Sequence, residues 1–431
     1  MRTLVLGAGV SGKAAADLAR RLGHEVIGYD EDETAAENAR RAGYAFGAGP
    51  WDTSRLRGVD LIVTSPGIPE QSTMIIDAAE SKAPLWSELE FASQQATAPL
   101  LAVTGTNGKT STVTAATAML EASGVKACAA GNIGTALSDV AQDAWDVIVV
   151  EASSFQLRFI ERFRPMGAVV LNVTPDHLDW HGSFDAYLDA KRRITANQDA
   201  ADLLAYGADD AGALAATSDT KARRVPISGR RIPEGGAGVE AATVHIDSYE
   251  FPAPEIGPDF LEDLVAAGVL AGLGGATESG IREGFAGFRP GPHRRSTIGI
   301  WDGVRWVDDS KATNPHAAVA AAAAYPSVVL IAGGRNKGLD LSPMADMPSV
   351  RHVVTIGESA SELGELLESG RVTAAHTLEA AVAAADEIAG DGDTILLAPG
   401  CASFDMFTSY AHRGDAFQRI VRSRKGGSDG Q

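Results

Sequence analysis

The stretch that decides the fold reads Val103-Thr104-Gly105-Thr106-Asn107-Gly108-Lys109-Thr110-Ser111-Thr112, and it extends the short apolar run 100–103. This order predicts a buried strand, a glycine-bearing turn and a helix that opens at Lys109. Backbone N–H groups in such a turn, together with the helix N-terminus, attract an anion. Lys109 adds a full charge for the β- and γ-phosphates, and Thr110 a hydroxyl for Mg²⁺. The stretch therefore predicts a nucleoside triphosphate site.

An acidic residue that suits this site follows a later apolar run. Glu151 closes the run 147–150 (Val-Ile-Val-Val). A phosphate-loop site needs a carboxylate for Mg²⁺ or its water, and Glu151 is the candidate. The alternative is a strand-end carboxylate that faces solvent, but beside the phosphate loop the metal role is favoured. The loop also departs from the general Walker spacing, because Val103 stands where the first glycine is expected.

Length and composition limit the class of protein. The chain has 431 residues, which predicts two or three domains, and its net charge is 37 − 56 = −19. An acidic chain repels phosphate backbones and anionic lipid, so nucleic acid and membranes are poor partners.

Cys128 and Cys401 give no disulfide framework. The first residues predict a strand and not a signal peptide, and no window approaches the ~20 apolar residues of a spanning helix. We expect a soluble, cytoplasmic protein. The lack of a heptad pattern or apolar strip favours a monomer.

The N-terminus carries a second glycine motif. A strand at 3–6 leads into Gly7-Ala8-Gly9-Val10-Ser11-Gly12, a helix follows, and the next strand ends at Asp30. This G-x-G-x-x-G spacing in a βαβ unit is typical of a dinucleotide site with Asp30 on a ribose. Two alternatives stay open, namely a tight βα turn without a ligand and a uridine nucleotide in the same crevice. Taken alone, the motif favours the dinucleotide.

Short apolar runs alternate with helical stretches along the rest of the chain, which predicts an α/β fold with parallel sheets. We predict three domains at 1–94, 95–289 and 290–431: a Rossmann-like domain, a P-loop ATPase-type domain and a second Rossmann-like domain. In the third, strands are expected near 298–301, 304–307, 327–332, 352–356 and 393–398, and helices near 315–324 and 377–389. Residues 207–260 give no clear signal, and the glycine-rich end, 426–430, is expected to fray.

Ligands of parallel sheets bind beyond the carboxyl ends of strands, where Lys109, Glu151 and His177 are all expected. His177 is a candidate Mg²⁺ ligand, although magnesium prefers oxygen.

Lys191 lies about two turns inside a helix that Ser183 caps, and its spacing alone favours a solvated lysine. Three strand-end loops of the third domain, 307–314, 333–338 and 398–404, suit an anionic substrate. Cys401 has no nearby histidine in sequence and is expected to be a buried residue, not a nucleophile.

Taken together, these segments resemble the Mur ligase family of ATP-dependent amide-forming enzymes. The resemblance covers most of the chain. Its motifs are 105–110 (Gly-Thr-Asn-Gly-Lys-Thr), 131–134 (Gly-Asn-Ile-Gly), 151–157 (Glu-Ala-Ser-Ser-Phe-Gln-Leu), 176–179 (Asp-His-Leu-Asp), Lys191, 293–294 (His-Arg), 309–314 (Asp-Ser-Lys-Ala-Thr-Asn), and 333–334 (Gly-Gly) with Lys337. The glycine turn and the runs 153–157 and 401–405 are most similar to those members that join D-glutamate to UDP-N-acetylmuramoyl-L-alanine.

The resemblance implies a role for each matching residue. ATP would contact Gly105, Thr106, Asn107, Gly108, Lys109, Thr110, Ser111, Arg294 and Asp309. Two Mg²⁺ ions would be served by Thr110, Glu151, His177 and a carbamylated Lys191, and the catalytic set would be Lys109, Glu151, His177 and Lys191. The uridine nucleotide would lie at Gly9, Val10, Ser11 and Asp30, with Asn132 and Ser153 along the muramoyl-alanine path. Glutamate would contact Lys311, Thr313, Lys337, Ser403, Phe404 and Tyr410.

Two positions depart from the family pattern. The family has His-Asn-x-x-Asn-Ala at the start of a helix before the third domain, and an asparagine there approaches ATP. Here the stretch 257–268 predicts the helix but contains neither asparagine. Residues 30–32 (Asp-Glu-Asp) are also unusually acidic for a uridine diphosphate site. The rival hypotheses are a sister ligase for another amino acid, a folylpolyglutamate-type ligase, a non-catalytic nucleotide-binding partner protein, and an NAD-dependent dehydrogenase.

Overall fold

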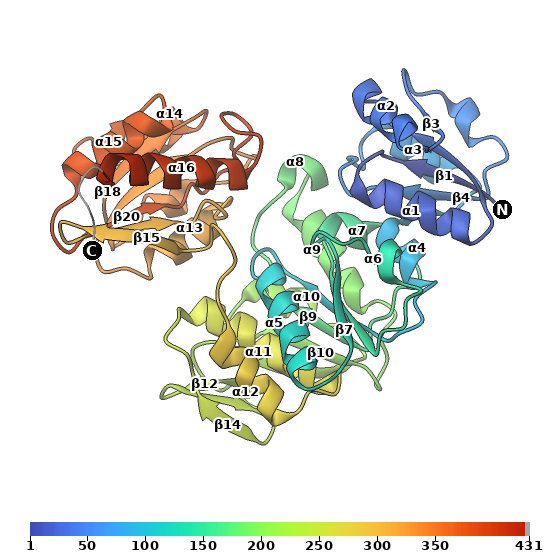
Figure 1. Ribbon diagram of the computed structural model, residues 1–431, viewed down its shortest axis with the longest axis horizontal. Helices are drawn as coiled ribbons and strands as arrows, with labels where there is room; N and C mark the ends of the chain where they lie inside the picture. The colour runs from blue at the N-terminus through green and yellow to red at the C-terminus, as the bar shows by residue number, and fades with distance from the viewer. Residues whose placement is uncertain (427–431) are drawn as a thin grey trace. The chain divides into compact units, whose positions relative to one another are not determined.

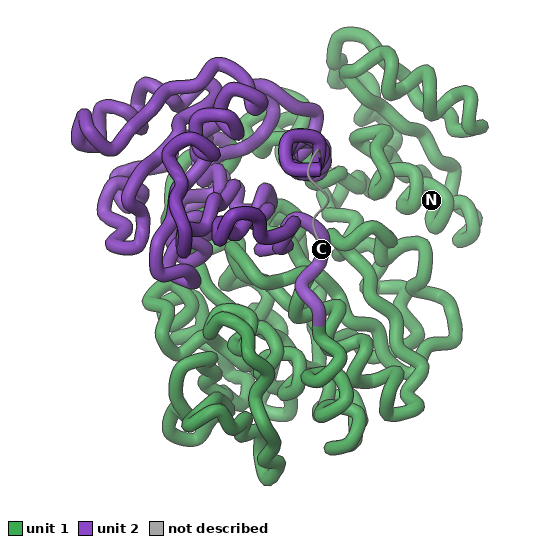
Figure 2. The backbone as a smooth tube through the Cα atoms, turned by 60° about the vertical axis from the view of Figure 1, so that its left-hand side comes forward, with its two compact units in different colours: residues 1–174, 180–288 green, residues 175–179, 289–431 purple. Residues whose placement is uncertain are grey.

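The computed structural model describes residues 1–426 and has three β-sheets with helices packed around them (Figure 1). Two compact units account for the chain (Figure 2). Unit 1 comprises Met1–Thr174 and Trp180–Phe288, and unit 2 comprises Pro175–Asp179 and the chain from Arg289 onward. The predicted multi-domain α/β fold is confirmed. The part of the glycine-rich end beyond Gly426 lies outside the described residues.

The first sheet is parallel and has the order β3-β2-β1-β4-β5. Its elements are β1 Arg2–Leu6, α1 Val10–Arg21, β2 Glu25–Tyr29, α2 Glu33–Arg41, β3 Phe46–Gly47, η1 Thr53–Leu56, β4 Leu61–Thr64, α3 Thr73–Glu80, β5 Leu85–Ser87 and α4 Glu88–Ser93. The strand order reverses between β1 and β4. Ligands of such sheets bind at this reversal, and the glycine turn after β1 lies there.

The second sheet has nine strands in the order β14-β13-β12-β11-β10-β9-β6-β8-β7, and only the pairs β12–β13 and β13–β14 are antiparallel. Its strands are β6 Leu100–Thr104, β7 Ala127–Gly131, β8 Val147–Glu151, β9 Gly167–Val170, β10 Leu203–Gly207, β11 Arg223–Ser228, β12 Ala237–Glu240, β13 Thr243–Ile246 and β14 Tyr249–Pro252. Its helices are α5 Lys109–Ala122, α6 Leu137–Val140, α7 Ser154–Arg158, α8 Leu178–His181, α9 Phe184–Arg192, η2 Arg193–Thr195, α10 Ala211–Ala216, α11 Pro258–Leu273 and α12 Glu278–Gly287. The stretch without a clear sequence signal thus contains α10 and the four short strands β11–β14.

The second sheet is buried on both faces. Side chains of α5, α11 and α12 form the core on one face. The core on the other face includes α4, α7 and Leu18 of α1, so the helix that follows the first glycine turn shares a core with the second sheet. This shared core explains why the first two sheets belong to one compact unit. Burial on both faces also explains why β6, β8 and β9 read as continuous apolar runs.

The third sheet has the order β15-β16-β20-β17-β18-β19 and is parallel except for the β15–β16 hairpin. Its elements are β15 Ser296–Trp301, β16 Val304–Asp308, α13 Pro315–Ala322, β17 Val328–Gly333, η3 Ser342–Met344, β18 Val350–Ile356, α14 Ala360–Leu366, β19 Val372–Ala374, α15 Leu378–Ile388, β20 Thr394–Leu397 and α16 Tyr410–Lys425. Every strand and helix predicted between residues 298 and 398 is present. Among residues 1–426, no helix combines the length and apolar character that crossing a membrane requires.

Candidate active site

The phosphate loop has the strand–turn–helix form that the sequence predicts. It joins β6 to α5, and Gly108 is the N-cap residue of α5 with φ 88°, in the left-handed region that favours glycine. Ser111, in the first turn of α5, is 6% exposed, and within residues 1–426 its Oγ has no hydrogen-bond partner. A buried hydroxyl without a partner beside a helix N-terminus fits a site built to receive phosphate oxygens.

Two lysines converge on one carbonyl of this loop. Nζ of Lys109 donates to the carbonyl oxygens of Gly105 at 2.7 Å and Thr106 at 3.0 Å. Nζ of Lys191 donates to the same Gly105 oxygen at 2.7 Å, and it lies 4.6 Å from the centre of the Tyr187 ring. The arrangement brings two ammonium groups to the place where the sequence predicts a triphosphate.

Lys191 is 1% exposed, so the prediction of a solvated lysine is wrong. Helix α9 turns Tyr187, Ala190 and Lys191 toward the protein interior. Spacing could not show this, because a lysine on the buried side of a helix is rare unless a specific partner holds its charge. Here the Gly105 carbonyl and the Tyr187 ring are those partners.

Glu151 sits at the end of β8 and is 3% exposed, so the solvent-facing alternative is also wrong. Its carboxylate accepts hydrogen bonds from Oγ1 of Thr110 at 2.9 Å and Nδ2 of Asn132 at 3.2 Å. Hydroxyl and carboxylate oxygens are the ligands that Mg²⁺ prefers. No three His, Cys, Asp or Glu side chains among residues 1–426 form a group that could hold a metal by themselves. The oxygens of Thr110 and Glu151 fit Mg²⁺ by their chemistry.

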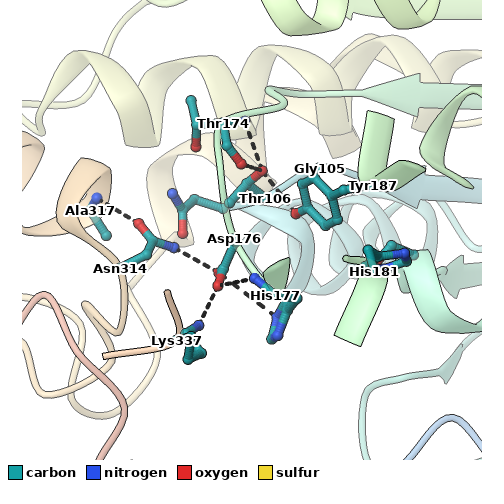
Figure 3. Close-up of polar contacts among 12 residues, drawn as sticks. Gly105, Thr106, Thr174, Asp176, His177, His181, Tyr187, Asn314, Ala317 and Lys337 are labelled. Atoms are coloured by element: carbon teal, nitrogen blue, oxygen red, sulfur yellow. Dashed lines mark hydrogen bonds and ion pairs between the residues drawn. The ribbon is translucent and has the colours of Figure 1, made fainter. Parts of the chain in front are cut away.

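Further contacts hold the loop from the side of β9, as Figure 3 shows for Thr106. Oγ1 of Thr106 bonds to the carbonyl of Thr174 at 3.1 Å and to the Tyr187 hydroxyl at 3.0 Å. Oδ1 of Asn172 accepts from the backbone N–H of Asn107 at 2.8 Å. Sequence reasoning did not assign a role to Asn172 or Tyr187. Asn172 lies just past a buried strand, and this position could have indicated that it lies at the ligand-binding edge of the sheet.

Segment Pro175–Asp179, which carries the predicted ligand His177, belongs to unit 2. Asp176 forms an ion pair with Lys337 and accepts from Nδ2 of Asn314 at 3.1 Å (Figure 3). Burial, the largest single cause, raises the pKa of Asp176, but the charges of Lys337 and His177 and the hydrogen bonds from Lys337 and Asn314 together outweigh it, so the pKa lies below its usual value. The side chain of His177 is 38% exposed and its φ is 53°. Lys337, predicted to contact glutamate, thus pairs with a carboxylate of its own unit.

The loops of the third sheet meet at its carboxyl edge. Nζ of Lys311 lies 3.8 Å from the centre of the Tyr410 ring, so two of the residues predicted to bind glutamate are together. Ser403 is buried, whereas Phe404 is 64% exposed. Cys401 is 2% exposed and burial raises its pKa, as expected for a buried residue that is not a nucleophile.

One buried arginine links these loops, and sequence reasoning missed it. Arg413 on α16 is 1% exposed. It donates to Oγ of Ser310 at 3.0 Å and to the carbonyl oxygens of Ser310 at 2.9 Å and Cys401 at 3.3 Å. Its position three residues after Tyr410 on a helix gave no sign of this role, because the partners are 103 and 12 residues away in sequence.

The residues predicted to contact ATP from unit 2 are half-buried or buried. Asp309 is 8% exposed and accepts from the backbone N–H of Arg295 at 3.2 Å. Burial raises the pKa of Asp309 to about 7, against the charges of Arg295 and Arg294, which lower it. Asp309 is therefore partly protonated at neutral pH and can act as a donor or an acceptor to a hydroxyl.

In the first glycine turn, Asp30 has a local role. Its carboxylate accepts from the backbone N–H of Ala8 at 2.6 Å and of Asp32 at 2.9 Å. Asp32 in turn caps α2 by accepting from the N–H of Thr34 at 2.8 Å. Two of the three acids at 30–32 are thus engaged in the turn. Val10 next to it is 67% exposed and is free to contact a ligand.

Ser153 opens α7 with a capping box in which its hydroxyl accepts from the N–H of Gln156. It is 6% exposed. Gly9 is exposed, and Ser11 and Thr313 are half-buried. The burial and hydrogen bonds of these residues do not test the roles that the sequence predicts for them.

Comparison with known proteins identifies the chain by family. The Mur ligase middle domain matches residues 103–250, and the Mur ligase, glutamate ligase domain matches residues 293–401. A third family, the alanine dehydrogenase/PNT C-terminal domain, matches residues 1–76. These matches follow the division into three sheets.

Two relatives with 38–40% identity over nearly their full length have the same name. The UDP-N-acetylmuramoylalanine–D-glutamate ligase of Frankia casuarinae is 40% identical over 98% of this chain and 94% of its own length. The enzyme of the same name from Myxococcus xanthus is 38% identical over 98% of both chains. A solved pseudomurein peptide ligase type C from Methanothermus fervidus shares the fold, with a TM-score of 0.62 and 19% identity over 98% of this chain and 100% of that one. The chain belongs to the Mur ligase family.

Proposed function

We propose that this protein uses ATP to join D-glutamate to UDP-N-acetylmuramoyl-L-alanine, a step in peptidoglycan precursor synthesis in the cytoplasm. The names of the full-length relatives support this substrate pair. The observation that carries the proposal is the convergence of Lys109 and Lys191 on the Gly105 carbonyl, beside the hydrogen-bonded pair of half-buried Thr110 and buried Glu151.

The chemistry follows from the substrates. A carboxylate is a poor electrophile, so the terminal alanyl carboxylate must first be activated. Its oxygen attacks the γ-phosphorus of ATP, and the bond to the β-phosphate oxygen breaks to give an acyl phosphate and ADP. The amine of D-glutamate then attacks the acyl carbon. The tetrahedral intermediate collapses to the amide, with loss of inorganic phosphate and a proton.

Residues of the chain act on charge and position. Lys109 neutralises the triphosphate, and the loop amides from Gly105 to Ser111 hold its oxygens in place. Thr110, Glu151, His177 and, if carbamylated, Lys191 would hold two Mg²⁺ ions, which would offset the negative charge of the three anionic substrates. Arg294 contacts the ATP phosphates and Asp309 the ribose.

The remaining sites bind the two joined substrates. Gly9, Val10, Ser11 and Asp30 hold the uridine nucleotide, and Asn132 and Ser153 line the muramoyl-alanine path. Lys311, Thr313, Lys337, Ser403, Phe404 and Tyr410 contact D-glutamate. The cation at Lys311 and its neighbour Tyr410 suit a dicarboxylic amino acid, which brings two negative charges.

The experiment that tests the proposal is ATP-dependent phosphate release with UDP-N-acetylmuramoyl-L-alanine and a panel of amino acids. We expect release with D-glutamate and little with L-glutamate, L-alanine, a diamino acid or D-alanyl-D-alanine. Release with another member of the panel would assign the chain to a sister reaction. Absence of release with all of them would contradict the ligase function.

One observation favours a different ligand for the first domain. The match of residues 1–76 to a dehydrogenase domain agrees with the G-x-G-x-x-G spacing and supports a dinucleotide there. Fluorescence titration with NADH and a separate calorimetric titration with a UDP-sugar distinguish the two. We expect saturable binding of the UDP-sugar and no saturable NADH signal.

A further inference from the structure

Helix α11 carries a buried acid beside the phosphate loop. This helix is the stretch that departs from the family pattern, and it packs along α5, the helix that the loop opens (Figure 1). Its buried residues are apolar apart from Asp263, which is 7% exposed. Burial of a carboxylate is costly unless polar or charged groups pair with it.

Asp263 lies directly against Gly108. A β-carbon built on Gly108 would be 2.1 Å from Oδ1 of Asp263 and 2.9 Å from its Cγ, so the carboxylate occupies the space that any other side chain at position 108 would need. Gly108 is also the N-cap residue of α5, and the backbone at a helix N-terminus carries partial positive charge. The acid thus meets the loop where the N-terminus of α5 contributes partial positive charge.

The contact has a counterpart on the adjacent residue. Asn172, past the end of β9, accepts from the N–H of Asn107 at 2.8 Å, and its own Nδ2 donates to the Asn107 carbonyl at 3.3 Å. At the tip of the loop, Asn172 thus contacts Asn107, and both Asp263 and Leu171 lie against Gly108. Asn172 and Asp263 are 91 residues apart in the sequence.

The neighbouring acid does not add a second full charge. Burial, which is the largest cause, and the charges of Asp263, Asp209 and Asp210 together raise the pKa of Glu262 to about 8. Glu262 is thus mostly protonated at neutral pH. At neutral pH, this part of α11 therefore carries less negative charge than two ionised adjacent acids would give it.

We propose that Asp263 is a positioning residue for nucleotide binding: its carboxylate holds Gly108, and with it the backbone amides at the N-terminus of α5, in the conformation that receives phosphate. The inference deepens the proposed function, since it assumes that this loop binds ATP. It assigns to the divergent helix α11 a contact with the loop itself.

The test is isothermal titration of the full-length protein with MgADP, which needs no turnover. We expect Asp263→Ala to weaken MgADP binding on the order of tenfold, because the side chain that packs against Gly108 is lost. Asp263→Asn, which keeps the size and one acceptor oxygen, should stay within about threefold of the wild type. Glu283→Ala, an exposed acid on α12, is the matched control and should not change binding.

Steady-state kinetics separates positioning from general damage. We expect Asp263→Ala to raise KM for ATP while KM for the other two substrates and the melting temperature of the free protein stay near wild type. Unchanged MgADP affinity, an equal rise in all three KM values, or tighter MgADP binding by Asp263→Asn would each overturn the inference. Wild-type protein that binds MgADP but releases no phosphate would overturn the proposed ligase function, and the effect of Asp263 on MgADP binding could still be measured.

Discussion

At the scale of single residues, the main feature of the phosphate loop is that two lysine side chains bind the same backbone carbonyl. Lys109 and Lys191 both donate to one carbonyl oxygen, although they lie 82 positions apart in the numbered chain. Two ammonium groups this close repel each other unless anions are near. The pair is therefore arranged for a multiply charged ligand.

Removal of Lys109 tests this arrangement. We predict that Lys109→Ala lowers turnover by about 10²–10³, comparable to the loss of one preorganised charge-stabilising donor. Phosphate release under saturating ATP is the measurement, and Lys126→Ala, a lysine that lies over the Trp145 ring, is the control. A turnover close to wild type would remove Lys109 from the catalytic set.

Carbamylation of Lys191 gives a second prediction at this scale. CO₂ adds to the neutral amine and converts a cation to a carboxylate-like group, which relieves the repulsion from Lys109. We predict that activity falls in CO₂-depleted buffer and returns with bicarbonate, and that ¹³CO₂ gives a carbamate signal by NMR. Lys191→Arg should show neither the bicarbonate response nor the signal. Activity that does not depend on CO₂, together with the absence of a carbamate signal, would contradict the prediction.

At the scale of elements, a buried carboxylate ties helix α4 to the segment after α7. Glu90 is 0% exposed and accepts three backbone N–H groups, from Glu161 at 3.0 Å, Arg162 at 2.9 Å and Phe163 at 2.8 Å. Both oxygens are used, so Glu90→Gln would turn an amide N–H₂ toward at least one of these donors. We predict a loss of roughly 1–3 kcal/mol in the free energy of unfolding.

Urea unfolding followed by circular dichroism measures this loss. Glu80→Gln, an exposed acid at the end of α3, is the control and should lie within about 0.5 kcal/mol of the wild type. If the two variants unfold at the same urea concentration, the three hydrogen bonds of Glu90 do not contribute as argued.

Elements also show how far sequence reasoning reaches. The phosphate loop and Glu151 could be predicted because their residue types are tied to strand ends that short apolar runs reveal. Strands β11–β14 could not, because their residues have mixed burial, whereas those of β6, β8 and β9 are buried throughout. The buried lysine at 191 and the contact of Asp263 with Gly108 depend on which face of a helix meets a distant segment. Periodicity cannot decide that for a charged residue.

At the scale of the whole molecule, the protein is acidic, and some of its acids are buried where they resist ionisation. Burial raises the pKa of Glu262 to about 8 in unit 1 and that of Asp309 to about 7 in unit 2. In the unfolded chain both would ionise near their ordinary values, 4.5 and 3.8. Above those values the folded protein holds more protons than the unfolded chain, so its stability falls as pH rises.

The sign for Glu262 gives the last prediction. Well below pH 4.5, Glu262 is protonated in both the folded and the unfolded protein, so it does not change the free energy of unfolding. Between pH 4.5 and about 8, only the unfolded chain releases this proton, which lowers the free energy of unfolding by up to about 1.4 kcal/mol per pH unit. Glu262→Gln cannot ionise, so we predict a flatter dependence of the unfolding free energy on pH from 5 to 8, with a gain over wild type that is largest at pH 8. Glu255→Gln, an exposed acid just before α11, is the control and should follow the wild-type curve. Curves for wild type and Glu262→Gln that run parallel from pH 5 to 8 would show that this carboxyl ionises in the folded protein as it does in the unfolded chain.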